Sequence, residues 1–249
     1  GCVPTGGGKG KGMKRALLIA SGHVDKYFAE RVISALREIE NPLMFAAADG
    51  GLRTFDMLGL RPALLVGDFD TVEAEILARY LDCPDIEVQR HNPVKDDSDL
   101  ALAIGALAEK GCAEIYVLGA LGGRADHSLA NMRLCYAYKK RGVSLYLLDE
   151  QNRIRCVLAT ERHFSLRRDR QWGKYLGFFP IGGTVEIKSL RGVRYPLTDF
   201  SLSDETAPTL TVSNEISADS AELELSGDPA AGLLLIESCD REESKWIRS

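Results

Sequence analysis

Short apolar runs alternate with helical patterns along the chain as far as about residue 148. Each run has the length of one buried strand, and the stretches between the runs repeat apolar residues every three or four positions. The predicted strands are 15–20, 43–48, 63–66, 86–89, 115–118 and 144–148. The predicted helices are 26–39, a short helix ending at 58, 72–81, a helix from 96 to a cap at 111, and 126–141. Strands that alternate with helices predict an α/β fold with a mainly parallel, Rossmann-like sheet flanked by helices.

The pattern changes after about residue 158, where the long helical periodicities end. Short apolar runs follow, separated by turns that contain glycine or asparagine. The predicted strands are 164–166, 175–179, 184–187, 209–213, 221–225 and 232–236, and 199–208 is a predicted surface loop. We therefore expect an α/β domain over residues 13–158 and an all-β sandwich domain over residues 159–249.

The first twelve residues, G-C-V-P-T-G-G-G-K-G-K-G, have no apolar pattern. We expect residues 1–12 to be an expression scar or a disordered extension. Their glycines and lysines do not make a P-loop, because that motif needs G-x-x-x-x-G-K-[ST] between a strand and a helix. Neither the spacing nor a preceding strand is present.

Polar and glycine-rich segments follow several of the predicted strands directly. Asp49 follows the second strand, Asp68 follows the third, and Gly119–Arg124 follows the fifth. In open α/β sheets, ligands bind beyond the carboxyl ends of the strands. These segments, far apart in the sequence, are therefore predicted to meet at one crevice.

Four aspartates are candidate metal ligands. Asp49 lies in D-G-G, Asp68 and Asp70 lie in G-D-F-D-T, and Asp99 lies in K-D-D-S-D-L. Mg²⁺ prefers oxygen ligands and needs only one or two direct carboxylates when substrate phosphates supply the rest. In extended backbone, Asp68 and Asp70 point the same way, and their like charges favour a cation between them. Together the four predict a Mg²⁺ site beside a phosphate-binding surface.

Each acidic segment also has a simpler explanation. The D-G-G segment alone fits an ordinary turn. Asp70 would serve as a cap for the helix that starts near residue 72, and Asp96 as a cap for the next helix with Asp99 at its third position. Capping leaves Asp68 without a role, and three acids with a serine after Lys95 exceed what a cap needs.

A glycine-rich segment, G-A-L-G-G-R-A-D-H, connects the fifth strand to a helix. Its backbone N–H groups are candidates for contacts with phosphate oxygens, and Arg124 for a bidentate phosphate contact. Asp126 is the expected N-cap of the helix, and His127 is expected to be structural. The glycines do not have the G-x-G-x-x-G spacing, which disfavours a nicotinamide-dependent oxidoreductase.

Composition narrows the classes of partner and compartment. The chain has 249 residues, 45% of them hydrophobic, and a formal net charge of −5. We expect no nucleic-acid partner without a dominant basic face, and no membrane partner because no apolar run approaches the ~20 residues of a membrane helix. Six cysteines are scattered without a C-x-x-C pair, which favours reduced thiols in a cytoplasmic protein.

The ordered set of motifs resembles the thiamine pyrophosphokinase family, in its bacterial branch. D-G-G, G-D-F-D-T, K-D-D-S-D and G-A-L-G-G-R-A-D-H stand in the order of the family, and D-H-S-L-A-N extends the last to Asn131. L-D-E-Q-N, G-V-R-Y-P-L and V-S-N-E are similar to its later motifs. Thr71 stands where serine is commoner and Ser98 where threonine is commoner, so both keep a hydroxyl. The resemblance covers about residues 15–237.

The resemblance implies an enzyme that transfers pyrophosphate from ATP to the hydroxyl of thiamine, giving thiamine diphosphate and AMP, with Mg²⁺. It also implies a homodimer with thiamine at the subunit interface, between the α/β domain of one chain and the β-sandwich of the other. By resemblance and position, Asp49, Asp68, Asp70 and Asp99 hold Mg²⁺ directly or through water. The expected catalytic residues are Asp70, Asp99 and Arg124; the expected ATP and phosphate contacts are Gly50, Gly51, Lys95, Gly119, Gly122, Gly123 and Arg124; the expected thiamine contacts are Asp126, Ser213 and Asn214.

Two other functions remain open. A related diphosphokinase that acts on another alcohol, such as a hydroxymethylpterin, would use the same aspartates and glycines. A non-catalytic Mg–nucleotide-binding module would bind ATP without releasing AMP. The S-N-E segment near the C-terminus favours thiamine over the pterin alcohol, because the thiamine enzymes carry it.

Overall fold

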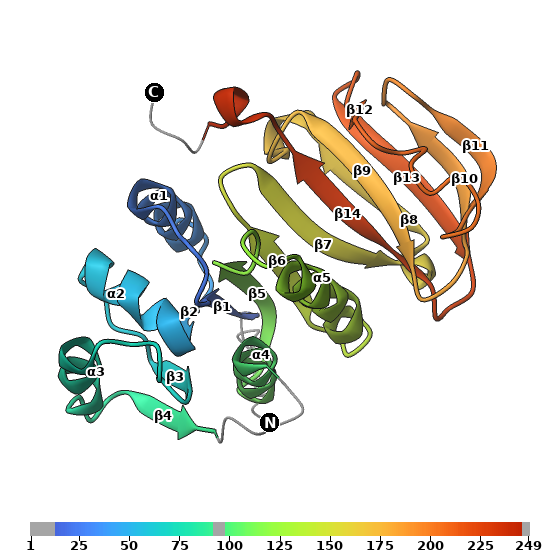
Figure 1. Ribbon diagram of the computed structural model, residues 1–249. Helices are drawn as coiled ribbons and strands as arrows, with labels where there is room; N and C mark the ends of the chain where they lie inside the picture. Colours follow the sequence, from blue (N-terminus) through green and yellow to red (C-terminus); the bar gives the residue numbers. More distant parts are fainter. Residues whose placement is uncertain (1–12, 92–97, 246–249) are drawn as a thin grey trace, which may run out of the picture.

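A ten-stranded sheet runs through the molecule, with helices on both faces of one half and a four-stranded sheet packed on the other half (Figure 1). The computed structural model describes residues 13–91 and 98–245. The strand order in the long sheet is β12-β9-β14-β7-β6-β5-β1-β2-β3-β4. The predicted α/β part followed by a β-sandwich is confirmed.

Six parallel strands form one half of the long sheet. They are β1 (Lys14–Ile19), β2 (Leu43–Ala48), β3 (Leu64–Gly67), β4 (Glu87–Arg90), β5 (Cys112–Leu118) and β6 (Ser144–Leu148). The central strands are apolar and buried along most of their length, which is typical of a parallel sheet covered by helices. Because all six are parallel, their carboxyl ends lie along the same edge of the sheet.

Three helices cover one face of this half and two cover the other. They are α1 (Lys26–Arg37), α2 (Leu52–Leu58) and α3 (Ala74–Leu81) on the first face, and α4 (Asp99–Glu109) and α5 (Ala125–Lys139) on the second. The carboxylate of Asp25 caps α1 by accepting the Phe28 N–H at 2.9 Å. The apolar side of α1 then packs on Leu17 and Ile19 of β1. In the described ranges, no helix has the length and apolar character needed to cross a membrane.

Antiparallel strands form the other half of the long sheet and the whole of the second sheet. They are β7 (Asn152–Leu158), β14 (Gly232–Ser238), β9 (Tyr175–Ile181) and β12 (Asn214–Glu215) in the long sheet, and β11 (Leu197–Leu202), β10 (Val185–Arg191), β13 (Ser220–Gly227) and β8 (His163–Arg167) in the second. Leu233 and Leu235 of β14 face Ile187 and Leu223 of the second sheet in one apolar core. The sandwich therefore shares one of its two layers with the α/β part.

β7 is a strand that the apolar pattern did not predict. Its sequence, N-R-I-R-C-V-L, alternates arginine with apolar residues, which is the pattern of a strand with two different faces. β7 pairs with β6 on one side and β14 on the other, so the long sheet runs across residue 158. The proposed domain boundary at this residue stays a prediction.

Two predictions for the sandwich are wrong. Residues 209–213 form a turn instead of a strand, and β12 begins only at Asn214. The Thr211 hydroxyl holds this turn to β9, because it accepts the Phe178 N–H at 3.0 Å and donates to the Phe178 carbonyl at 2.5 Å. The predicted surface loop 199–208 begins inside β11, where Leu202 is buried in the sandwich core.

Helix α4 begins at Asp99, later than predicted. Ser98 is its N-cap, with extended backbone and an Oγ that accepts the Ala101 N–H at 3.2 Å. Asp99 therefore occupies the first helical position instead of the third. The predicted cap, Asp96, lies outside the described residues.

A buried carboxylate joins the helical half to the sandwich. Glu237 of β14 is fully buried and accepts two hydrogen bonds from Arg153, both at 2.6 Å. It also accepts the Trp172 N–H at 2.9 Å, and the Trp172 ring meets Phe28 of α1 edge-on at 6.1 Å between centroids. Glu237 thus orients the aromatic contact through which α1 touches the antiparallel half.

We expect Glu237→Gln to lower the free energy of unfolding by about 3 kcal/mol, because it leaves the partly buried Arg153 guanidinium without its counter-charge. Urea denaturation measures this loss. Glu224→Gln is the matched control, since Glu224 pairs with Arg191 in solvent and such pairs contribute about 0–1 kcal/mol. Equal losses in the two variants would contradict the role given to Glu237.

Candidate functional site

The carboxyl ends of four neighbouring strands meet at one edge of the sheet. In spatial order, Asp68 follows β3, Asp49 follows β2, Ser21 follows β1 and Gly119 follows β5. β1 and β5 are adjacent, yet the chain leaves β1 towards β2 and builds β5 on the other side. Open α/β sheets bind ligands at such a switch point.

Glycines allow the loops at this edge to touch through their backbones. The Gly22 N–H donates to the Gly119 carbonyl at 3.0 Å. A Cβ on Gly22 would lie 2.3 Å from the Gly119 oxygen, and a Cβ on Gly51 would lie 2.0 Å from the Ile19 oxygen. These two positions exclude any side chain because the loops are packed against one another. Gly51, predicted to contact ATP, therefore has a packing role of its own.

The structure brings three of the four predicted aspartates together. One carboxylate oxygen from each of Asp49, Asp68 and Asp70 lies within 4.8 Å of the others. The charge of Asp68 raises the pKa of Asp70 above its ordinary value, with smaller contributions from partial desolvation, Asp49 and Asp99. Asp99 thus acts on the same group from the first turn of α4. The role of the four as metal ligands stays a prediction.

The backbone around the aspartates is strained. Asp49 and Phe69 have φ angles of +46° and +61°, which are uncommon outside glycine. Asp49 Oδ1 accepts the Phe69 N–H at 3.1 Å, and Asp68 Oδ1 accepts the Asp70 N–H at 3.2 Å. Gly67 adopts φ +148°, and a Cβ there would lie 3.1 Å from Asp49 Cα. Such conformations persist where the surroundings enforce them, and they concentrate at functional sites.

Two hydroxyl groups contact Asp49, and neither contact was predicted from the sequence. Ser21 Oγ donates to Asp49 Oδ2 at 3.3 Å and accepts the Gly50 N–H at 3.1 Å. Thr71 Oγ1 donates to the same Oδ2 at 3.0 Å. For Thr71 the signal was a hydroxyl kept directly after the paired aspartates, and for Ser21 it was a polar residue just after the first strand.

The glycine-rich segment after β5 has an open surface. Gly122 and Gly123 adopt φ angles of +81° and +63°, and no atom lies within 4 Å of where their Cβ atoms would be. Asn131 of α5 is buried and donates to the Ala120 carbonyl at 2.8 Å, which fixes the start of the loop. The left-handed backbone and open space suit the approach of an anion to the N–H groups.

Arg124 and Asp126 bind each other at the start of α5. Arg124 Nε and Nη2 donate to the two carboxylate oxygens of Asp126 at 3.1 and 2.6 Å. This pairing holds the pKa of Asp126 below its ordinary value. Asp126 is not the N-cap that the sequence predicted, because Arg124 occupies the cap position and α5 begins at Ala125. Lys95, which was also predicted to contact phosphate, lies outside the described residues.

The predicted thiamine contacts Ser213 and Asn214 lie at the far edge of the long sheet. Ser213 has a left-handed backbone, with φ +58°. Asn214 is 2% exposed, and its Oδ1 accepts the Tyr195 N–H at 3.0 Å while its Nδ2 donates to the Tyr195 carbonyl at 2.9 Å. The amide of Asn214 thus already has partners within the chain.

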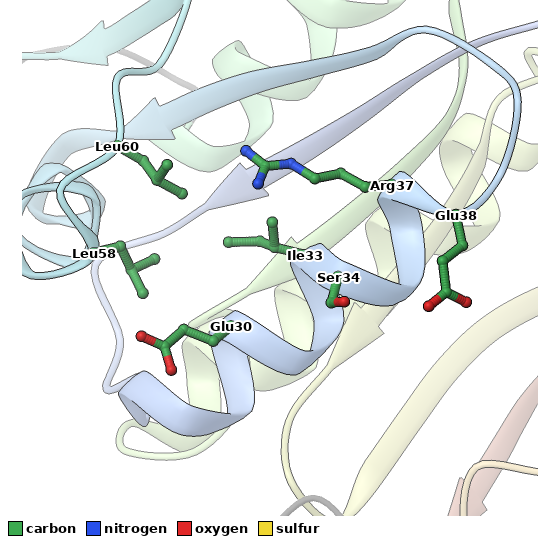
Figure 2. Close-up of a pocket in the computed structure, with 7 residues that line it drawn as sticks. All are labelled: Glu30, Ile33, Ser34, Arg37, Glu38, Leu58 and Leu60. Carbon is green, nitrogen blue, oxygen red and sulfur yellow. The ribbon is translucent and has the colours of Figure 1, made fainter.

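The groove drawn in Figure 2 is separate from these residues. It lies between α1 and the end of α2, over Ile33, Arg37, Leu58 and Leu60. These positions are at the end of α1 and just before β3, so they lie at the edge of the sheet opposite the aspartates. Apolar shape alone would place the site wrongly here.

Two family models match the chain. The first, "Thiamin pyrophosphokinase, catalytic domain", matches residues 36–147, and the second, "Thiamin pyrophosphokinase, vitamin B1 binding domain", matches residues 162–228. Thiamine pyrophosphokinase of Bacillus subtilis is 30% identical over 173 residues, which cover 70% of this chain and 78% of the relative. The chain belongs to the thiamine pyrophosphokinase family.

Solved structures agree with membership of the thiamine pyrophosphokinase family. The crystal structure of thiamine pyrophosphokinase from B. subtilis has a TM-score of 0.75 and 25% identity, covering 91% of this chain and 99% of that one. The enzyme from Geobacillus thermodenitrificans has a TM-score of 0.74 and 26% identity, covering 92% and 99%. Yeast thiamin pyrophosphokinase, 14% identical with a TM-score of 0.71 and covering 91% and 86%, shares the fold.

Members of this family are enzymes that transfer pyrophosphate from ATP to thiamine with a divalent metal ion, and this chain is an enzyme of this type. The prediction of family and activity is confirmed, and the two other functions are not favoured. The aspartate cluster fits the metal, because hard divalent cations prefer carboxylate oxygens. The raised pKa of Asp70 reports a concentration of negative charge that a cation would offset.

We expect Asp70→Asn to raise the melting temperature of the metal-free protein slightly, and to remove at least about half of the increase that saturating Mg²⁺ or Mn²⁺ gives. Because the pKa of Asp70 is raised in the fold, its ionisation destabilises the metal-free protein as the pH rises past that pKa. Calorimetry with EDTA or with cation measures both effects.

Glu73→Gln is the control for the Asp70 variant. Glu73 is an exposed carboxylate three residues further on, and it pairs with Arg53 at 2.8 Å. Its loss should leave the increase caused by the cation intact. If the cation raised the melting temperature of Asp70→Asn as much as that of the wild type, Asp70 would not be part of the metal site.

Proposed function

We propose that this chain converts ATP and thiamine into AMP and thiamine diphosphate, with Mg²⁺ as the divalent ion. The observation that carries the proposal is the gathering of Asp49, Asp68 and Asp70 at strand ends beside an open glycine loop at a switch point. The four strands involved lie side by side in the order β3, β2, β1, β5, so their ends span three strand spacings, about 14 Å. That span allows a nucleotide to reach the aspartates with its phosphates while it contacts the glycine loop.

In the proposed reaction, the thiamine hydroxyl oxygen forms a bond to the β-phosphorus of ATP. The opposite bond, between the β-phosphorus and the oxygen that bridges it to the α-phosphorus, breaks, and this oxygen leaves with AMP. Transfers of this type depend on positioning and charge neutralisation more than on covalent help from the protein. Asp49, Asp68, Asp70 and Asp99 would hold Mg²⁺, directly or through water. The ion would supply charge neutralisation at the phosphate oxygens.

The proton of the thiamine hydroxyl needs an acceptor. Asp70 and Asp99 are the two candidates, because each acts at the aspartate cluster and Asp70 has a raised pKa. A raised pKa makes a carboxylate a better base while it is ionised. If only one of the two aspartates accepts the proton, Asp70→Asn and Asp99→Asn should lower turnover at saturating Mg²⁺ to different extents.

The glycine loop and its neighbours would bind the phosphates of ATP. Gly119, Gly122 and Gly123 present left-handed backbone, and Gly122 and Gly123 face open space. The proposed phosphate contacts are completed by Gly50, Gly51, Lys95 and Arg124. Arg124 reaches a phosphate by exchanging Asp126 for it, and the freed Asp126 carboxylate then opposes the positive thiazolium of thiamine.

A homodimer with thiamine at the subunit interface is part of the proposal. Ser213 and Asn214, the proposed thiamine contacts, lie on or next to β12, five strand spacings from β5. That is about 24 Å along the sheet, which is too far for one thiamine molecule to touch both sites in one chain. A second copy that brings its own β12 to the glycine loop resolves the separation.

Exposed apolar side chains around Asn214 support this interface. Leu210 and Val212 lie in the turn that leads to Asn214, and the Tyr195 backbone is hydrogen-bonded to the Asn214 side chain. The exposed fractions of Leu210, Val212 and Tyr195 are 46%, 50% and 54%. Clustered apolar side chains on a surface are typical of an interaction site. The cytoplasm is the proposed compartment, since the described cysteines are free thiols and burial raises the pKa of Cys156 to about 12.

The activity is tested with ATP, Mg²⁺ and thiamine, with AMP and thiamine diphosphate followed by chromatography. We expect the two products in equal amounts, and no AMP when thiamine is omitted. Hydroxymethylpterin in place of thiamine is the comparison substrate. AMP release with the pterin alone would favour the related diphosphokinase, and ATP binding without AMP across both alcohols would contradict catalysis.

We expect Tyr195→Asp to weaken the dimer at least about tenfold, because it buries an unpaired charge in an apolar interface. Sedimentation equilibrium measures the dissociation constant. Ile39→Asp is the matched control, since Ile39 is 45% exposed at the edge of the sheet opposite the aspartates. A monomeric wild type, or equal weakening in both variants, would argue against the proposed interface.

A further inference from the structure

The Asp49 carboxylate is a meeting point for segments that follow two other strands. Ser21, just after β1, donates to Oδ2, and Thr71, just after β3, donates to the same oxygen. The Phe69 N–H, from the loop that carries Asp68, donates to Oδ1. Asp49 is only 9% exposed, so these groups within the chain supply much of what water would otherwise supply.

The bonds to Asp49 determine where the neighbouring aspartates lie. Phe69 stands between Asp68 and Asp70 and holds a left-handed φ of +61°, which an ordinary residue does not adopt without a compensating contact. Its N–H bond to Asp49 Oδ1 is that contact. If the Asp49 carboxylate turned, the contact would be lost and the paired carboxylates would no longer be held within 4.8 Å.

The two hydroxyls control this turning. Both bind Oδ2, so Oδ1 is left directed at Phe69. The absence of a side chain at Gly50 makes room for them, because a Cβ there would lie 3.2 Å from Ser21 Cβ and 3.3 Å from Thr71 Oγ1. Gly50 also donates its N–H to Ser21 Oγ at 3.1 Å, which fixes the Ser21 rotamer.

We infer that Ser21 and Thr71 are positioning residues of the metal site, acting through Asp49. The inference rests on the proposed function for the identity of the ion. Ser21 and Thr71 are themselves exposed residues. Their effect falls on the orientation of Asp49, and through it on the spacing of Asp68 and Asp70.

The test compares Thr71→Val, which has the shape of threonine without the hydroxyl, with Thr71→Ser, which keeps the hydroxyl. Ser21→Ala and the double variant Ser21→Ala/Thr71→Val complete the set. Binding of Mn²⁺ alone, followed by electron paramagnetic resonance, reports the metal site without any turnover. Turnover with ATP, Mg²⁺ and thiamine is measured in parallel as kcat and as KM for thiamine.

We expect Thr71→Val to weaken Mn²⁺ binding about three- to tenfold, which corresponds to about 1 kcal/mol for one lost hydrogen bond, and Thr71→Ser to restore it. The double variant should lose more than the product of the two single losses, because Oδ2 then has neither donor. We expect kcat to fall in the same order and KM for thiamine to stay within about twofold, since the hydroxyls act on the ion.

Ser165→Ala is the matched control, because the Ser165 hydroxyl donates to the Glu222 carboxylate at 2.7 Å on the four-stranded sheet. It should keep wild-type Mn²⁺ affinity. Unchanged Mn²⁺ affinity in the double variant would overturn the inference, as would a loss in Thr71→Ser equal to that in Thr71→Val. Should the wild type bind Mn²⁺ yet form no AMP with thiamine, the proposed function fails while the metal-binding series still decides the positioning roles.

Discussion

The parallel pairing of six strands is the constraint on which the site depends. It places the ends of β3, β2, β1 and β5 along one edge, although the residues that follow them run from Ser21 to Gly119 in the sequence. Strand pairing also fixes their spacing at about 4.8 Å per strand, which no loop could do alone. The glycine contact between Gly22 and Gly119 then locks the two loops at the switch point. A rigid sheet edge thus supports a site built almost entirely from loops.

The site is held in an arrangement that the chain alone would avoid. Carboxylates gathered within 4.8 Å repel one another, and the raised pKa of Asp70 records that repulsion. The left-handed backbone at Asp49 and Phe69 adds strain at the same place. Packing elsewhere, such as the buried β1 and β3 strands, supplies the stability that offsets both. Functional sites commonly lower the stability of their fold in this way.

Local pattern predicted most of the parallel half and less of the antiparallel half. Buried apolar strands and amphipathic helices carry their period in the sequence, so β1, β2, β6 and α1 were predicted to within two residues at each end. The turn at 209–213 was predicted as a strand because apolar Leu210 and Val212 alternate with Thr209 and Thr211. The turn forms instead because the Thr211 hydroxyl is hydrogen-bonded to the Phe178 backbone.

The candidate site was predicted only in part, because only some of its residues are marked by the local sequence pattern. Acidic residues after apolar strands are visible in a sequence, and Asp49, Asp68 and Asp70 do converge. Ser21 and Thr71 were missed because a hydroxyl gains meaning only from the carboxylate it faces, and that partner comes from another strand. Pairwise contacts between distant segments are set by tertiary packing, which periodicity does not encode.

The ion pair between Arg124 and Asp126 bears on the proposed role of Arg124 as a phosphate contact. The two side chains are 73% and 62% exposed, and exposed pairs contribute about 0–1 kcal/mol. A phosphate offers the same bidentate geometry with more charge, and in the proposed site the neighbouring backbone N–H groups of Gly122 and Gly123 would add to its binding. The pair therefore orients Arg124 towards the start of α5 without binding it tightly enough to exclude a nucleotide. Exchange of one anion for another is a small rearrangement, whereas ordering a free arginine would cost conformational entropy.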